Sequence, residues 1–111
     1  MPEIRMNEAI RDALHEEMER DETVFVLGED VIAHGGPYAV TRGIAECFPD
    51  RIRQTPISEA GIVGTALGAA LCGMRPVAEM MYVDFVTCAM DEVVNQMAKV
   101  RYMFGGQTDV P

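Results

Sequence analysis

The residue best placed to do chemistry is Glu59, the one charged side chain in the glycine-rich stretch of residues 55–73. No base stands beside it in the sequence to pair with its carboxyl. In a poorly hydrated site such an acid could keep its proton at neutral pH, as general acid–base catalysis requires. The alternative is a solvated acid in a first helical turn, stabilised by the helix dipole beside a Ser58 cap. Because caps are far commoner than catalytic acids, the motif alone favours the structural role.

Further candidates lie where apolar, strand-like runs end. Glu29 and Asp30 follow one such run, Ile57 follows a second, and Met81 and Phe85 follow a third. Ligands of open α/β sheets bind at the edge formed by the carboxyl ends of the strands. Acids there could bind the edge of a flat, nitrogen-bearing ring, with Phe85 or Met81 on its face. The alternative for Phe85 is core packing, which its residue type alone favours.

Several other kinds of site are not predicted. No G-x-G-x-x-G follows the first apolar run, and no glycine-rich turn ends in Lys-Ser or Lys-Thr, so phosphate-binding loops are absent. His15 and His34 have no visible partners and are interpreted as surface residues, which argues against a metal or nucleophilic site. The scattered Cys47, Cys72 and Cys88 suit neither disulfides nor metal spacing. We expect buried thiols in a reducing cytoplasm.

The charge distribution is strongly acidic. The net charge is −9, and ten of the 18 acidic residues fall in the first 30 positions, mostly along residues 8–22. This makes nucleic acid an unfavourable partner. The acids are typical of the solvated face of a helix, although binding to a basic protein is an alternative.

Periodicity and turn residues predict an α/β fold. Helices and strands should alternate, giving a parallel sheet with helices on both faces. The expected helices are 6–20, 40–48, 59–72 and 84–103, and the expected strands are 23–28, 51–55 and 76–80.

Two features point beyond a self-sufficient domain. Three strands make a small sheet with a bare edge, and residues 110–111 stop where a fourth strand should begin, so we expect a larger domain. Gly64 and Gly68 lie on one face of helix 59–72, where each glycine costs about 0.5–1 kcal/mol relative to alanine. A close helix contact would explain them, either inside the domain or across a subunit interface.

A family resemblance joins these observations. Its motifs run along nearly the whole chain without a large gap: residues 27–30 (LGED), 55–64 (TPISEAGIVG), 74–79 (MRPVAE), 82–85 (YVDF) and 101–106 (RYMFGG). The chain resembles the β subunit of the thiamine-diphosphate-dependent 2-oxo acid dehydrogenases, which include the pyruvate, branched-chain 2-oxo acid and acetoin enzymes. It corresponds to the first part of the pyrimidine-binding domain. Residues 1–111 would form a single partial domain, with its remainder and a carboxy-terminal transketolase-like domain absent.

The resemblance implies specific roles. Glu59 would be catalytic, hydrogen-bonding a ring nitrogen of the aminopyrimidine of thiamine diphosphate and so favouring the imino tautomer. Glu29, Ile57, Met81 and Phe85 would line the cofactor pocket. An α subunit would hold the diphosphate and Mg²⁺, and the heterotetramer would decarboxylate a 2-oxo acid and acylate the lipoyl group of an acyltransferase component.

Alternatives within and beyond enzymes stay open at this point. A transketolase-like or deoxyxylulose-phosphate-synthase-like subunit would use the same acid for a different transfer. A non-catalytic assembly module would use only the glycine helix and the acidic face.

Overall fold

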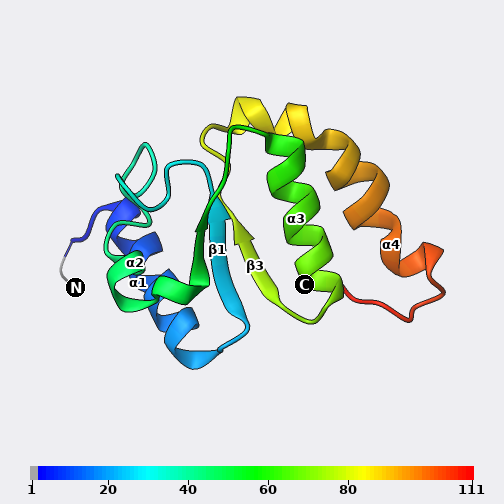
Figure 1. Cartoon of the computed structure of the whole chain (residues 1–111), viewed down its shortest axis with the longest axis horizontal. Helices are drawn as coiled ribbons and strands as arrows, with labels where there is room; N and C mark the ends of the chain where they lie inside the picture. Colours follow the sequence, from blue (N-terminus) through cyan, green and yellow to red (C-terminus); the bar gives the residue numbers. More distant parts are fainter. Residues whose placement is uncertain (1–2) are drawn as a thin grey trace.

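Three short parallel strands form the centre of the computed structural model, which describes residues 3–111 (Figure 1). Their order is β2-β1-β3, so the first strand in the sequence is central and pairs with both of the others. Its β-branched, apolar sequence suits a strand that is covered on both faces. The predicted parallel α/β sheet is confirmed. The strands are β1 (Val24–Gly28), β2 (Ile52–Gln54) and β3 (Arg75–Ala78).

Helices lie on both sides of this sheet (Figure 1). The first two α-helices cover one face, and the third covers the other, with a final helical segment packed against it. The elements are α1 (Met6–Arg20), α2 (Ile44–Cys47), η1 (Pro49–Arg51), α3 (Glu59–Leu71), η2 (Val83–Ala89), η3 (Asp91–Met97) and α4 (Ala98–Met103).

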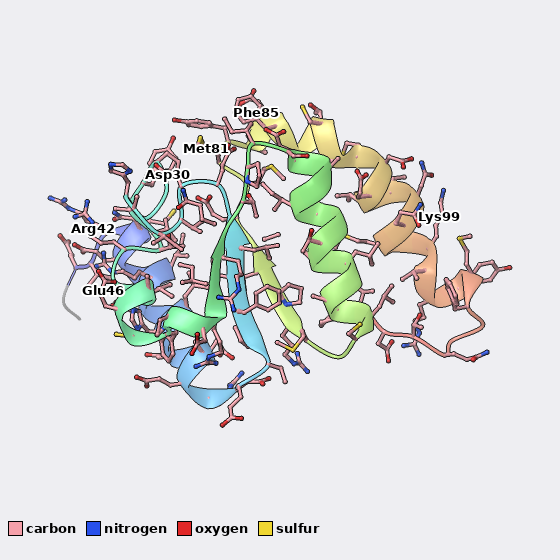
Figure 2. The ribbon with its side chains drawn as sticks, in the orientation of Figure 1. Asp30, Arg42, Glu46, Met81, Phe85 and Lys99 are labelled. Carbon is pink, nitrogen blue, oxygen red and sulfur yellow. The ribbon has the colours of Figure 1, made fainter. Side chains whose placement is uncertain are left out.

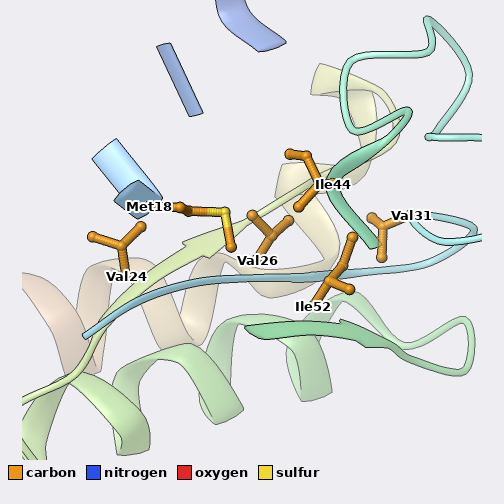
Figure 3. Close-up of a cluster of buried hydrophobic side chains, with 6 residues drawn as sticks. All are labelled: Met18, Val24, Val26, Val31, Ile44 and Ile52. Carbon is orange, nitrogen blue, oxygen red and sulfur yellow. The ribbon is translucent and has the colours of Figure 1, made fainter. Parts of the chain in front are cut away.

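The larger hydrophobic cluster lies between the sheet and helices α1 and α2 (Figure 3). Alternate residues of β1 point to this side, and complete burial of one such side chain stabilises the fold by about 1.5–3 kcal/mol. This cluster anchors the amino-terminal half of the chain to the sheet. Its buried members are Met18, Val24, Val26, Val31, Ile44 and Ile52.

The cluster on the opposite face is smaller. Leu27 packs there against Ile62 and Ala66 of α3, with Phe25 and Ala78 partly buried around them. Small side chains let α3 lie close to the sheet. The start of this helix is thereby fixed beside the ends of the strands.

The prediction of one long α-helix over residues 84–103 is wrong in the type of helix. The segment is helical, but it begins as the 3₁₀-helix η2, passes into the π-helix η3 and becomes α-helical only in α4. The Thr87 hydroxyl donates to the Asp84 carbonyl at 2.7 Å. Such side-chain-to-backbone bonds and the β-branched residues of this segment weaken a regular α-helix.

The helix predicted for residues 40–48 is also shorter than expected. Only Ile44–Cys47 is α-helical, because Ala39 and Gly43 adopt positive φ angles of 55° and 86° that an α-helix excludes. Thr41 is buried and its hydroxyl donates to the Val31 carbonyl at 2.8 Å. Residues 40–43 therefore belong to the preceding loop.

Other surface predictions have mixed outcomes. The expectation of buried thiols is wrong, because all three cysteines are exposed. Cys47 is the last residue of α2, Cys72 directly follows α3, and Cys88 lies on η2. His34 is exposed, as predicted, but it has a partner in Asp30, with 3.1 Å between Nδ1 and Oδ1. His15 is half-buried, with its ring 5.7 Å from that of Phe48. Within residues 3–111, no helix is long and apolar enough to cross a membrane.

Candidate functional site

The candidate site lies at the edge where the three parallel strands end. Asp30 follows β1, while Met81 and Phe85 follow β3, and the three side chains lie at the same end of the molecule (Figure 2). The turn from β2 leads through Ile57 into α3, which begins at Glu59 on this edge (Figure 1). The parallel topology therefore brings the sequence-predicted site residues to one edge.

Glu59 occupies the first turn of α3. Ser58 caps the helix, and its hydroxyl accepts a hydrogen bond from the Gly61 amide at 3.3 Å. Glu59 is half-buried, and no side chain among residues 3–111 donates a hydrogen bond to its carboxyl. The cap geometry agrees with the structural interpretation, but the carboxyl itself stays free to bind a ligand. Its catalytic role remains a prediction.

The loop after β1 is folded back on itself. Asp30 has φ of 57°, and its carbonyl accepts from the Gly36 amide at 3.0 Å. The Gly35 carbonyl accepts from the Thr41 amide at 3.1 Å, which closes the far side of the loop. A non-glycine residue in the left-handed region stores strain and is often found at functional sites.

Glu29 stands at the base of this loop and is only 6% exposed. Burial of an acid is costly unless it is paired, protonated or bound by a ligand. The sequence placed Glu29 at a strand end, and the structure adds that it is buried.

A half-buried acid behind this edge, Glu79, was not singled out from the sequence. It directly follows β3, where its amide donates to the Leu27 carbonyl at 2.8 Å and extends the pairing of the strands. Its Oε2 is buried and has no hydrogen-bond partner among residues 3–111. Burial, followed by the negative charges of Glu29 and Asp30, raises the pKa of Glu79 above its ordinary value. The available signal was its position, since it directly follows the third strand as Glu29 directly follows the first.

Aromatic rings border the same edge. The ring of Phe85 lies 5.9 Å from that of Tyr82, which in turn lies 6.1 Å from that of Tyr38, both in edge-on contacts. Phe85 is 39% exposed, so the alternative that it is a core residue is wrong for this chain. Met81 is half-buried, whereas Ile57 is 81% exposed. Tyr38 was not predicted as part of this group.

Chemically, the edge carries groups that could bind a flat, nitrogen-bearing ring. Free carboxyls can bind a ring nitrogen or an exocyclic amine, and Phe85 and Met81 can contact a ring face. The Thr55 hydroxyl at the end of β2 is a further buried polar group without a partner. Residues 3–111 contain no group of three or more potential ligands arranged to hold a metal ion. The unpartnered carboxyls and the aromatic rings are groups that can contact the edge and the face of a flat ring.

A cavity lies away from the predicted site residues. It has a volume of about 500 Å³ and is lined by Met6, Asn7, Ile10, Tyr38 and Val40, and none of the predicted site residues lines it.

Comparison with known proteins places the chain in a family. Residues 2–111 match the family described as the transketolase pyrimidine binding domain. The pyruvate dehydrogenase E1 component subunit beta of Rickettsia bellii is 50% identical over 110 residues, which are 98% of this chain and 34% of that protein.

Two further relatives carry related names. The acetoin:2,6-dichlorophenolindophenol oxidoreductase subunit beta of Cupriavidus necator is 46% identical, covering 93% of this chain and 33% of that protein. The mitochondrial pyruvate dehydrogenase E1 component subunit beta of Homo sapiens is also 46% identical, covering 98% and 31%. The chain spans about one third of the length of these relatives. The resemblance to these β subunits is confirmed, and the chain belongs to the transketolase pyrimidine-binding domain family.

Proposed function

We propose that this chain supplies the aminopyrimidine-binding half of a thiamine diphosphate site in a 2-oxo acid dehydrogenase. The observation that carries the proposal is the free carboxyl of Glu59 at the start of α3, on the same sheet edge as buried Glu29 and the Phe85 ring. The names of the relatives, which include pyruvate dehydrogenase and acetoin oxidoreductase β subunits, support the reaction class.

Each predicted side chain has a task in this proposal. Glu59 binds a ring nitrogen and holds or releases a proton there, which controls the tautomer of the pyrimidine. Glu29 would bind the polar edge of the ring, while Met81 and Phe85 contact its face and Ile57 borders it. When bound, thiamine diphosphate would supply the electron sink needed to decarboxylate a 2-oxo acid.

We propose that a second subunit holds the charged end of the cofactor. Neither a phosphate-binding loop nor a metal cluster is found within residues 3–111, so an α subunit would hold the diphosphate and Mg²⁺. The β designation of the relatives supports such a partner. The complete assembly would be a heterotetramer that passes the acyl group to the lipoyl acyltransferase component of a multienzyme complex.

Helix α3 is the proposed contact with that partner. A Cβ added at Gly68 would have no atom within 4 Å, and one at Gly64 would meet only the Glu92 side chain, at 3.9 Å. Packing within the chain therefore does not require glycine at position 68. This supports the alternative in which these glycines permit close approach of another subunit.

Substitution of Glu59 tests the proposal directly. In the complete enzyme, Glu59→Gln should keep assembly but lower turnover by about 100-fold or more, because the amide cannot transfer the proton. Steady-state turnover with saturating thiamine diphosphate measures the effect. The matched control is Glu8→Gln, since Glu8 is another first-turn acid but lies on α1. Near-normal turnover of Glu59→Gln would remove the assigned role.

A further inference from the structure

Glu79 has an unusual environment among the residues that the structure describes. It is the one acid in residues 3–111 with a buried carboxyl oxygen and no hydrogen-bond partner for it. An ionised carboxylate in that position would be costly, because no donor replaces the water it has lost. Such a group needs a proton, a ligand or a structural reason to be there.

Two glycines, Gly28 and Gly36, lie close to Glu79. A Cβ on Gly28 would lie 2.9 Å from the Glu79 carbonyl oxygen and 3.1 Å from its Cβ. A Cβ on Gly36 would lie 2.7 Å from Glu79 Oε1, and Gly36 also has a positive φ of 73°. The side chain of Glu79 thus extends from the end of β3, past the end of β1, to the underside of the loop.

The loop of residues 29–41 begins at Glu29, so its position affects the candidate cofactor site. Bonds from Gly36 to Asp30 and from Thr41 to Gly35, with the Thr41 hydroxyl on the Val31 carbonyl, make it one folded unit. Gln54 of β2 adds a further link, since its Oε1 accepts from the Ile32 amide at 3.3 Å. A shift of the Glu79 side chain would therefore change the position of the whole segment that follows Glu29.

We propose that Glu79 is a positioning residue for the cofactor pocket, which supports the loop of residues 29–41 from below and so fixes buried Glu29. This inference rests on the proposed function, and it adds a residue that does not touch the cofactor. The groups that face Glu79 are acidic: Glu29 at the end of β1 and Asp30 in the loop. His34 is already paired with Asp30, and the side chain of Arg42, beyond Gly35, is exposed.

The charge of Glu79 then controls how well the loop is held. The protonated carboxyl can lie beside Glu29 and Asp30, whereas the ionised form repels both without a compensating donor. As the pH rises above 4.5, the ordinary value for the glutamate pKa, the wild-type loop loses support. A glutamine at this position keeps the shape without acquiring charge.

The experiment uses the full-length subunit assembled with its partner subunit, and titration calorimetry with Mg²⁺ and thiamine diphosphate over a range of pH. At the acid end of this range, where Glu79 keeps its proton, Glu79→Ala should weaken binding about tenfold, as expected if the loop is in place about one tenth of the time. Glu79→Gln should bind increasingly well relative to wild type as the pH rises. Turnover at saturating cofactor should change by less than about threefold in both variants, because Glu79 does not touch the reacting atoms. Glu46→Gln, an exposed acid on α2, is the control and should follow wild type at each pH.

The outcomes separate the two proposals. Failure of the wild-type assembly to bind thiamine diphosphate would overturn the proposed function, before any variant is considered. If the wild type binds, then affinity curves of Glu79→Gln and wild type that stay parallel across pH would overturn the positioning role. That comparison remains decisive if Glu79→Ala fails to assemble, since glutamine preserves the shape.

Discussion

The two ends of the sheet hold their acids in opposite environments. At the amino ends, Asp21 accepts hydrogen bonds from the Thr23 amide at 2.8 Å and hydroxyl at 2.6 Å, and pairs with Arg75 at 3.3 Å. At the carboxyl ends, Glu79 has a buried oxygen with no partner in the described part of the chain, and the charge of buried Glu29 acts on it. Natural folds tend to satisfy their polar groups except where function requires otherwise. The comparison supports the proposal that the cofactor binds at the carboxyl edge of the sheet.

The pKa shifts follow the same division. The hydrogen bonds from Thr23, and then the charges of Arg75 and Arg20, lower the pKa of Asp21. Burial and two neighbouring acids raise the pKa of Glu79. One end of the sheet therefore favours the charged form of its acid, and the other end favours the neutral form.

Helix α3 begins at the candidate site and carries the surface proposed for assembly. Gly68→Leu on this helix should have a larger effect than a change of Asp21 or Glu79. The added side chain should weaken subunit association by about 1–3 kcal/mol, the usual cost of overpacking, while leaving the subunit fold nearly unchanged. Sedimentation of the assembled enzyme measures association, and thermal unfolding of the subunit measures stability.

Asp12→Leu on exposed α1 is the matched control for a large apolar residue on a helix surface. Unchanged sedimentation together with lowered thermal stability of Gly68→Leu would show that the glycine serves packing within the subunit.

The opposite pKa shifts of Asp21 and Glu79 predict effects of opposite sign on the free energy of unfolding. We expect both effects to be smaller than that of Gly68→Leu on association. Asp21 contributes stability above its ordinary pKa of 3.8, and this contribution is lost as the pH falls through its lowered pKa. For Glu79 the contribution is present below 4.5 and is lost as the pH rises through its raised pKa. Urea unfolding of the subunit as a function of pH measures both.

The two variants should therefore diverge. Asp21→Asn should be less stable than wild type at neutral pH, with the difference disappearing in acid. Glu79→Gln should gain stability relative to wild type as the pH rises. The comparison of the two ends fails if both variants shift the pH profile in the same direction.

Sequence patterns predicted the sheet and most helices because their signals are local. The apolar run of residues 24–27 and the cap at Ser58 specify β1 and the start of α3 without any distant contact. The irregular winding of residues 83–103 and the shortness of α2 could not be predicted in this way. Both depend on positive φ angles or side-chain bonds such as those of Thr41 and Thr87.

The site was partly predictable for the same reason. Glu29, Met81 and Phe85 follow strand-like runs, so a parallel sheet places them at one edge. The environment of Glu79 was not predictable, because it arises where residues 28, 36 and 79 meet in space. Sequence position can locate an acid at a strand end, but burial and partners depend on tertiary contacts.

The central claim is that this chain provides only the pyrimidine half of a shared site, and calorimetry with Mg²⁺ and thiamine diphosphate tests it most directly. A stacking contact and a hydrogen bond are worth about 0.5–1.5 kcal/mol each, too little to offset the several kcal/mol cost of association. The 111-residue chain alone should therefore show little or no heat of binding and no turnover, whereas the assembly with its partner subunit should bind the cofactor. Micromolar binding by the purified chain alone would contradict the account.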